Sequence, residues 1–366
     1  MSDDPAAMVA RAAARCRTAV VGGPPVTPAA SFAALARACD ELGIDEWDVY
    51  GERGAVARLE SRVAELFGRD DAVLFPTGVA AQQCALRIWC DRRGTRRVAM
   101  PDVAHPLVHE EDGPRRVQGL EVERLTVGRA VPTPAALEAI PGALAAAVVE
   151  LPLRDAACLL PSWDQLAAFA DACRARGVPL HADGARVWEA HVAWGRPPAD
   201  VGALADSVYV SLYKGLGAHA GALVACDAGF ARELRVWRRR IGGTAFRMTT
   251  LAVGGLVGLR DELPRMPDHL AWARRLAGAL RAEGFRMYPD QPAISTFAVF
   301  ADGDADALNR RLAAYMEATS VRLCAAWRAV GAPGRAMTEF AVYSSALEHD
   351  PADVARRLTE VARPGG

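Results

Sequence analysis

The segment that decides the fold is Ser207-Val208-Tyr209-Val210-Ser211-Leu212-Tyr213-Lys214-Gly215-Leu216-Gly217. Residues 207–212 are rich in apolar and β-branched side chains, which predicts a buried strand, and the two glycines behind them predict a tight turn. Lys214 stands where the strand ends. Open α/β sheets bind their ligands outside the carboxyl ends of the strands, so we interpret Lys214 as a residue of the active site.

Lys214 is also the only lysine in the 366-residue chain, in which every other basic side chain is an arginine. A primary amine can lose its proton near neutral pH and attack a carbonyl carbon, which a guanidinium cannot do. A lysine left on the surface by chance would favour a polar helical context, whereas Lys214 follows an apolar run. We therefore predict that Lys214 forms a Schiff base.

Working outward from this strand, segments with strand and helix patterns alternate along the chain. The predicted strands are 72–75, 97–100, 120–125, 145–151, 178–182 and 207–212, and the clearest helices are 27–42, 55–67 and 162–175. Such alternation predicts an α/β fold, with a mostly parallel sheet covered by helices on both faces. Behind residue 228 the pattern changes to long helices and then to a small α+β region. We expect an N-terminal segment and helix (1–45, irregular to about residue 26), a large domain (46–262) and a small C-terminal domain (263–366).

Composition excludes several classes of partner and location. The net charge is −1, which argues against nucleic acid or a membrane surface as a partner. No apolar run approaches membrane-spanning length. The eight cysteines show no metal-binding spacing, and the start of the chain (Ser2-Asp3-Asp4) lacks the order of a secretory signal. We expect reduced thiols, no metal and a cytoplasmic location.

Three further features that could belong to the same active site as Lys214 also follow predicted strands. Pro76-Thr77-Gly78-Val79 lies between a strand and a helix, where backbone amides can hold a phosphate. Asp183 ends the strand 178–182, and His105 follows the strand 97–100. Asp183 could instead be an ordinary helix N-cap. An amine, a carboxylate, a flat ring and a phosphate seat in this order are the parts of a pyridoxal phosphate site.

At this point the chain resembles a known family. The motifs that carry the resemblance are His181-Ala182-Asp183-Gly184-Ala185-Arg186, Tyr213-Lys214-Gly215-Leu216-Gly217-Ala218, Asp48-Val49-Tyr50-Gly51-Glu52, Pro76-Thr77-Gly78 and Ala104-His105. They are similar to those of the threonine aldolase and β-eliminating lyase family of pyridoxal-phosphate enzymes, within the aspartate aminotransferase fold. The resemblance covers roughly residues 46–260 well and the last third more loosely.

The resemblance implies a role for each matching position. Lys214 would be the Schiff-base lysine, Asp183 the partner of the pyridine nitrogen, and His105 the side chain stacked on the ring. The phosphate would be held by Thr77, Gly78, the Val79 amide and Arg238 or Arg239.

Substrate-binding residues are implied in the same way. Arg186 and Arg335 would bind the substrate carboxylate, since guanidinium suits bidentate contacts. Tyr50 and His219 would lie near the substrate. The resemblance also implies a homodimer or homotetramer whose active sites are shared between subunits.

The implied reaction is cleavage of a β-hydroxy-α-amino acid, of the threonine or allo-threonine type, to glycine and an aldehyde. Three departures bear on it: the N-terminal region has no Ser-Asp-Thr-Val-Thr-like segment, Val79 stands where the family has a threonine, and a second family histidine is absent from Glu150-Leu151-Pro152-Leu153-Arg154. Removal of the β-hydroxyl proton needs a base, and His105, His109 and His219 remain candidates. An amino-acid racemase or a β-eliminating lyase on the same scaffold is the alternative.

Other classes of protein explain less of the sequence. Gly215-x-Gly217-x-x-x-Gly221 suggests a nicotinamide-dependent dehydrogenase, but that fingerprint needs a helix at the glycines, and residues 222–226 have a strand pattern. The spacing of His105 and His109 suggests a metal only weakly, because a proline follows His105. A non-catalytic member of the fold would not need Lys214, Asp183, His105 and Arg186 together.

Overall fold

The computed structural model describes residues 4–23 and 25–363. Ser2, Asp3 and Pro24 lie outside this range. The chain separates into two compact units: a small unit of Met1–Ser31 with Arg265–Gly366, and a large unit of Phe32–Pro264. The expected N-terminal segment 1–45 is thus divided between the units, and the later division falls within three residues of the expected one.

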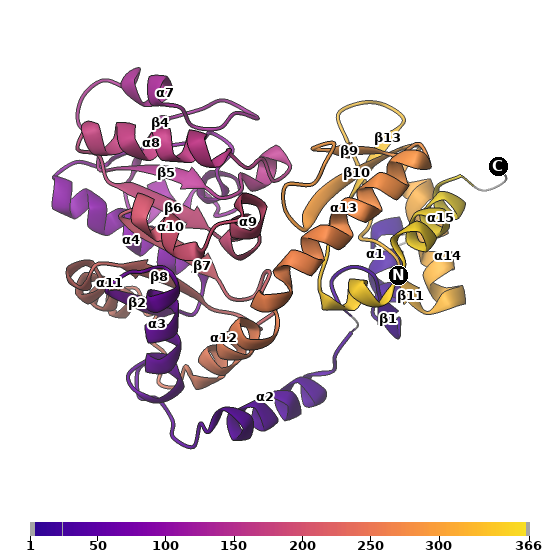
Figure 1. Ribbon diagram of the computed structural model, residues 1–366, viewed down its shortest axis with the longest axis horizontal. Helices are drawn as coiled ribbons and strands as arrows, with labels where there is room; N and C mark the ends of the chain where they lie inside the picture. The colour runs from indigo at the N-terminus through magenta and orange to yellow at the C-terminus, as the bar shows by residue number, and fades with distance from the viewer. Residues whose placement is uncertain (1–3, 24, 364–366) are drawn as a thin grey trace. The chain divides into compact units, whose positions relative to one another are not determined.

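A seven-stranded sheet forms the centre of the large unit (Figure 1). Its order is β2 (Asp71–Phe75), β8 (Ala222–Cys226), β7 (Ser207–Ser211), β6 (Leu180–Gly184), β5 (Ala146–Glu150), β3 (Arg97–Met100) and β4 (Glu121–Arg124). Strands β3 to β7 are parallel, and β8 is antiparallel to both of its neighbours. The carboxyl ends of β2 to β7 therefore share one edge of the sheet.

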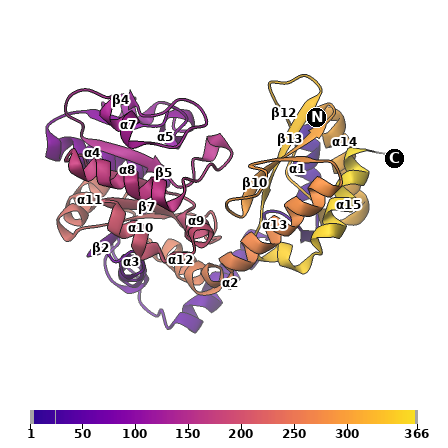
Figure 2. The same ribbon diagram turned by 45° about the horizontal axis from the view of Figure 1, so that its top comes forward.

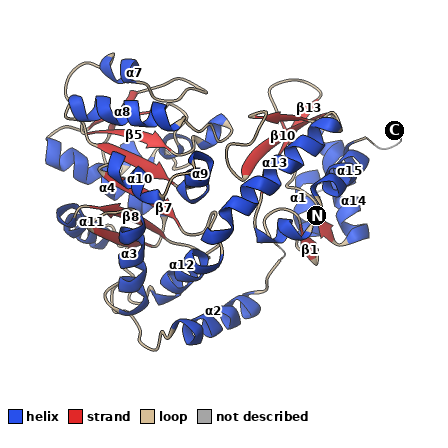
Figure 3. Ribbon diagram, in the orientation of Figure 1, coloured by secondary structure: helices blue, strands red, loops and turns tan. Residues whose placement is uncertain are grey.

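Helices cover both faces of this sheet, as Figures 2 and 3 show. Strand side chains alternate between the faces, so Val73 and Phe75 pack in one core with α4 (Gly78–Arg93) and α11 (Ala228–Arg240). The opposite side contacts α3 (Gly54–Leu66), α8 (Trp163–Ala175) and α10 (Pro198–Leu204). The predicted α/β class with a mostly parallel, doubly covered sheet is confirmed.

Further helices connect these elements. They are α2 (Pro28–Leu42), α5 (His105–Val108), α6 (Gly113–Arg116), α7 (Pro134–Glu138), η1 (Arg154–Ala156), α9 (Val187–Trp194), α12 (Thr249–Asp261) and η2 (Leu263–Arg265). Helix α8 begins with the capping box of Ser162 and Gln165, whose side chain and backbone groups satisfy each other reciprocally.

The small unit has its own antiparallel sheet and core. The sheet order is β12 (Arg328–Ala329), β13 (Arg335–Ala341), β10 (Thr296–Asp302) and β9 (Arg286–Tyr288). Its helices are α1 (Pro5–Ala13), α13 (Met266–Ala282), α14 (Ala305–Thr319) and α15 (Pro351–Ala362), with η3 (Ser344–Glu348), and β1 (Thr18–Ala19) pairs with β11 (Val321–Arg322). The small C-terminal α+β domain is confirmed.

One expectation about the N-terminus is wrong. Residues up to about 26 were expected to be irregular, but they contain helix α1 and strand β1. Asp4 caps the helix by accepting from the Ala6 amide, and Val9 and Ala12 are buried in the core of the small unit. So short a helix is stabilised by packing rather than by its own propensity, and packing is not visible in local sequence.

The expected cytoplasmic location concerns the state of the cysteines and the character of the helices. All eight cysteines are free, and seven of them are buried. In the part of the chain that the structure describes, no helix combines the length and apolar character needed to cross a bilayer.

Candidate active site

Five chemically active side chains lie at the carboxyl edge of the large sheet. Thr77 follows β2, His105 follows β3, Glu150 ends β5, Asp183 is the penultimate residue of β6, and Lys214 follows β7. Glu150 and Asp183 are register partners on adjacent strands. The parallel arrangement thus brings together residues from five separate segments.

Lys214 begins a tight turn in the connection between β7 and the antiparallel β8. The Gly217 amide donates to the Lys214 carbonyl at 3.1 Å, and the Ala218 amide to the Leu212 carbonyl at 2.9 Å, which closes the turn. Burial lowers the pKa of the Lys214 ammonium, the nearby Asp183 charge opposes this effect, and Arg186 adds to it. The amine is therefore available in its neutral, nucleophilic form more readily than a solvated lysine.

Asp183 is 1% exposed and has a donor on each carboxylate oxygen. The Ala185 amide donates to Oδ1 at 3.1 Å, and Gln82 Nε2 donates to Oδ2. Burial raises the pKa of Asp183, while the charge of Lys214 and these hydrogen bonds lower it. Burial leaves the pKa of Asp183 raised overall, and the two donors and the cation are the groups that stabilise its ionised form against this rise.

Behind Asp183 runs a buried chain of hydrogen bonds. Trp89 Nε1 donates to Ser207 Oγ at 3.0 Å, Ser207 Oγ contacts His181 Nδ1 at 2.8 Å, and His181 Nε2 contacts Gln82 Oε1 at 2.8 Å. Burial lowers the pKa of His181 to about 3, so its ring is neutral.

The direction of this chain follows from its two ends. An indole can only donate, and an ionised carboxylate can only accept. Gln82 must therefore present its NH₂ group to Asp183 and its carbonyl to His181. His181 then carries its proton on Nε2 and accepts from the Ser207 hydroxyl at Nδ1. Every link points toward Asp183.

His105 is held by two acidic side chains. Its backbone amide donates to Glu150 Oε2 at 2.9 Å, and its Nδ1 lies 3.3 Å from Glu110 Oε1. The hydrogen bond to Glu110 raises the pKa of His105 against the effect of burial, with Asp183 adding to the rise. Burial and the Asp183 charge raise the pKa of Glu150 to about 8.

The first turn of α4 provides a potential anion-binding site. Thr77 Oγ1 accepts from the Ala80 amide at 3.2 Å and caps the helix, and the amides of the first turn have no carbonyl partners within the helix. A Cβ on Gly78 would collide with Tyr209 Oη, so only glycine fits there. Val79 is 39% exposed, which leaves this turn accessible to a ligand.

Two predicted arginines lie in different surroundings. Arg186 follows Asp183 in the same strand-to-helix connection, with Nε 3.9 Å from Glu189 Oε2, and its charge acts on Lys214. Arg238 is 3% exposed and donates to the Leu74 carbonyl and to Thr244 Oγ1 at 3.3 Å. Arg238 is thus engaged close to the end of β2, and its phosphate role remains a prediction.

The other predicted substrate residues are more exposed. Tyr50 has a φ of 55°, and its ring packs edge-on against Phe246 at 5.2 Å. His219 is exposed on the loop between β7 and β8. Arg335 belongs to the small unit, where its Nε lies 3.3 Å from Asp302 Oδ1. Their roles also remain predictions.

Sequence reasoning missed Gln82, Glu110 and Glu150 as site residues. Glu150 could have been found from the sequence, because it ends a strand predicted to be buried, and burying a carboxylate costs free energy unless other groups bind it. Gln82 and Glu110 could not, since each is one polar residue among many. The dehydrogenase fingerprint is not formed, because β8 rather than a helix follows Gly217 and Gly221.

Comparison with known proteins agrees with this geometry. The model of the beta-eliminating lyase family matches residues 26–302. A low-specificity L-threonine aldolase of Arabidopsis thaliana is 29% identical over 268 residues, which are 70% of this chain and 74% of that protein. The low specificity L-threonine aldolase of Escherichia coli K12 is 28% identical over 246 residues, 65% of this chain and 72% of the relative.

Among solved structures, a Listeria monocytogenes protein assigned as an L-allo-threonine aldolase superposes with a TM-score of 0.89 at 27% identity. The match covers 98% of this chain and 99% of that one. The predicted resemblance is therefore confirmed, and the chain belongs to the beta-eliminating lyase family.

Proposed function

We propose that this protein is a pyridoxal-phosphate-dependent aldolase that cleaves a β-hydroxy-α-amino acid of the threonine type to glycine and an aldehyde. The observation that carries the proposal is the joint placement of Lys214 and Asp183 at one sheet edge, each altering the pKa of the other. The similarity to threonine aldolases from a plant and a bacterium supports the same reaction class.

The residues present fit the chemistry of this cofactor. At the start of α4, where a Cβ on Gly78 would collide with Tyr209 Oη, the backbone amides and the helix dipole favour a phosphate. Asp183 is a buried carboxyl group with a donor at each oxygen, and its ionised form suits a protonated ring nitrogen. The side-chain amine of Lys214 is a nucleophile that suits the aldehyde group of the cofactor. When bound, the cofactor would supply an electron sink for the bond that breaks at the substrate Cα.

The protein's own groups then have separate tasks. Asp183 maintains negative charge at one end of the site, and the Gln82–His181–Ser207–Trp89 chain fixes its orientation. The lowered pKa of Lys214 lets its amine give up and take back a proton more readily than a solvated lysine can. We assign the substrate carboxylate to Arg186 and Arg335, and ring stacking to His105.

Product analysis tests the proposal. Purified protein supplied with pyridoxal phosphate should release glycine and acetaldehyde from threonine or allo-threonine. Inverted amino acids without cleavage would indicate a racemase, and pyruvate from serine would indicate a β-eliminating lyase. Borohydride should bleach the visible absorbance and add the reduced cofactor to the peptide that contains Lys214. Colourless, active protein with an unmodified Lys214 would refute the assignment.

We further propose a homodimer or homotetramer with shared sites. The loop before α3 and the connection before α12 expose Trp47, Val49, Tyr50 and Phe246 at 59%, 44%, 50% and 55%. Arg247 lies over the rings of Trp47 and Phe246 at 5.7 and 4.3 Å. Aromatic side chains and arginine in an exposed cluster are typical of an interface.

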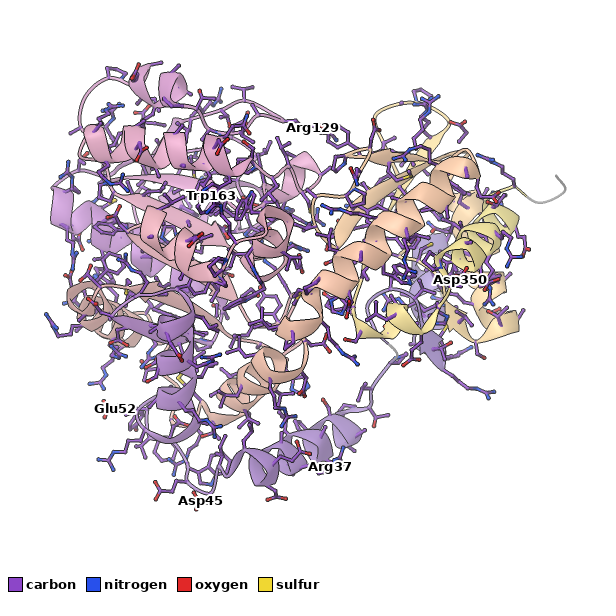
Figure 4. The ribbon with its side chains drawn as sticks, in the orientation of Figure 1. Arg37, Asp45, Glu52, Arg129, Trp163 and Asp350 are labelled. Atoms are coloured by element: carbon purple, nitrogen blue, oxygen red, sulfur yellow. The ribbon has the colours of Figure 1, made fainter. Side chains whose placement is uncertain are left out.

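Helix α2 extends this exposed region along the chain. Of its fifteen residues only Ala38 is buried, and Phe32 is 65% exposed. Figure 4 labels Arg37 on α2, and Asp45 and Glu52 in the connection that follows it. Light scattering should give a dimer or tetramer mass. Mixing inactive Tyr50 and Lys214 variants should restore activity if the sites are shared, and a monomer would contradict the proposal.

We also propose a cytoplasmic location, which the eight free thiols support. Cell fractionation of the native host should recover the protein with cytoplasmic markers. Recovery with the secreted or membrane fraction would contradict the proposal.

A further inference from the structure

His109 is a histidine near the carboxyl edge that has no part in the cofactor site. It follows the single turn of α5, and its Nε2 lies 2.7 Å from Asp155 Oδ2. The two side chains are 46% and 26% exposed, so the pair is accessible rather than buried. A carboxylate at this distance accepts the Nε2 proton and leaves Nδ1 with a lone pair. This is the arrangement of a histidine oriented for proton abstraction.

His109 lies next to His105, the residue to which we assign ring stacking. His105 and His109 are four residues apart across α5 and therefore share one face of the turn. Their ring centroids are 5.1 Å apart at 45°. The charges of Asp183 and Lys214 both act on His105, so this face of α5 is turned toward the active site.

Asp155 approaches from a different element. It belongs to η1, which follows the end of β5 at Glu150. The Arg154 amide donates to Glu150 Oε1 at 2.8 Å, and the His105 amide donates to Glu150 Oε2. One buried carboxylate thus anchors both segments and holds Asp155 and His109 opposite each other.

Other candidate bases are occupied by different contacts. Both ring nitrogens of His181 are hydrogen-bonded inside the protein. Glu110 at 3.3 Å favours the protonated form of His105. Glu150 uses both oxygens on backbone amides. His219 is an exposed loop residue and remains the competing assignment.

We propose that His109, oriented by Asp155, is the base that removes the proton of the substrate β-hydroxyl. The inference rests on the aldolase function proposed above. The hydroxyl proton moves to Nδ1, the Cα–Cβ bond breaks with its electron pair left on Cα, and the β-carbon becomes the aldehyde. Cα gains one proton to give glycine, so the proton released at oxygen balances the one taken up at carbon. No oxidant or reductant is needed.

The test compares threonine cleavage with a reaction of glycine, a substrate that has no β-hydroxyl group. Exchange of the α-proton of glycine with D₂O, followed by NMR, uses the same cofactor and Lys214 but needs no base at a hydroxyl. We expect His109→Gln to lower kcat for threonine cleavage by about 100-fold or more, with little change in KM. Glycine exchange and the visible absorbance should remain at wild-type levels.

Asp155→Asn provides the second variant, since Asp155 is a positioning residue. Without the Asp155 carboxylate at 2.7 Å the His109 ring loses the contact that orients it, so kcat for threonine cleavage should fall while glycine exchange stays at the wild-type level. His349→Gln, in the small unit, is the control and should match the wild type in both reactions.

Three results would overturn the inference. His109→Gln could cleave threonine at the wild-type rate while His219→Gln does not. His109→Gln could lose glycine exchange and cleavage in parallel, which would indicate a structural role. Finally, wild-type protein could exchange glycine but cleave no β-hydroxy amino acid, in which case the proposed function fails and this inference with it. The first two results leave the aldolase assignment intact.

Discussion

Replacing Gln82 with glutamate tests the hydrogen-bond chain behind Asp183. Gln82 is 2% exposed, donates to Asp183 and accepts from His181. The introduced glutamate can make the same two contacts when it is protonated, because its O–H donates to Asp183 and its carbonyl accepts from His181. The ionised form cannot, since two buried carboxylates would then face each other. Gln82→Glu should therefore fold well only while the pair holds a proton.

The size and sign of the effect follow from linkage. An unfolded glutamate titrates near 4.3, whereas the folded pair keeps its proton to higher pH. Between these values the folded state binds more protons than the unfolded state, so stability falls as pH rises. Each pH unit contributes about 1.4 kcal/mol, and the loss from pH 5 to pH 8 can reach about 4 kcal/mol.

Urea unfolding of wild type and Gln82→Glu at pH 5 and pH 8, with equal cofactor loading, measures this loss. Gln165→Glu is the matched control, because the capping box of α8 accepts glutamate as readily as glutamine. The difference between Gln165→Glu and wild type should stay nearly constant with pH. Equal differences for Gln82→Glu at pH 5 and pH 8 would refute the buried, ionised Asp183 and the direction of the chain.

Two further substitutions probe the phosphate seat and a buried ion pair. Gly78→Ala places a methyl group against Tyr209 Oη, so cofactor affinity measured by fluorescence titration should fall by about 5- to 150-fold, from overpacking of about 1–3 kcal/mol. Adding Tyr209→Phe should recover part of it, and full affinity of the single variant would contradict the assigned seat. Arg235→Met leaves Glu60 buried without the Arg235 contact at 2.8 Å, beside Asp71. Unfolding should become easier by about 3 kcal/mol, with partial recovery in Arg235→Met/Glu60→Gln, and no loss would mean that Arg235 contributes little.

Local sequence determined much of the site in advance. Lys214 at the end of an apolar strand, Thr77 before a helix and Asp183 at a strand end are local patterns, and each element formed where its pattern predicted. The alternation of strands and helices then indicated that these ends share an edge, because parallel strands joined by helical crossovers all point the same way.

Tertiary structure alone decided which side chains from other segments contact the residues of the site. His181 and Asp183 are two residues apart in β6 and therefore point to the same face of the sheet. Only the packing of α4 on that face, 101 positions away in sequence, supplies Gln82 to both. Likewise, His109 meets Asp155 because a turn after β3 and a turn after β5 converge at one edge. A pattern within one segment specifies that segment's backbone, whereas these contacts depend on which segments the folded chain places against each other.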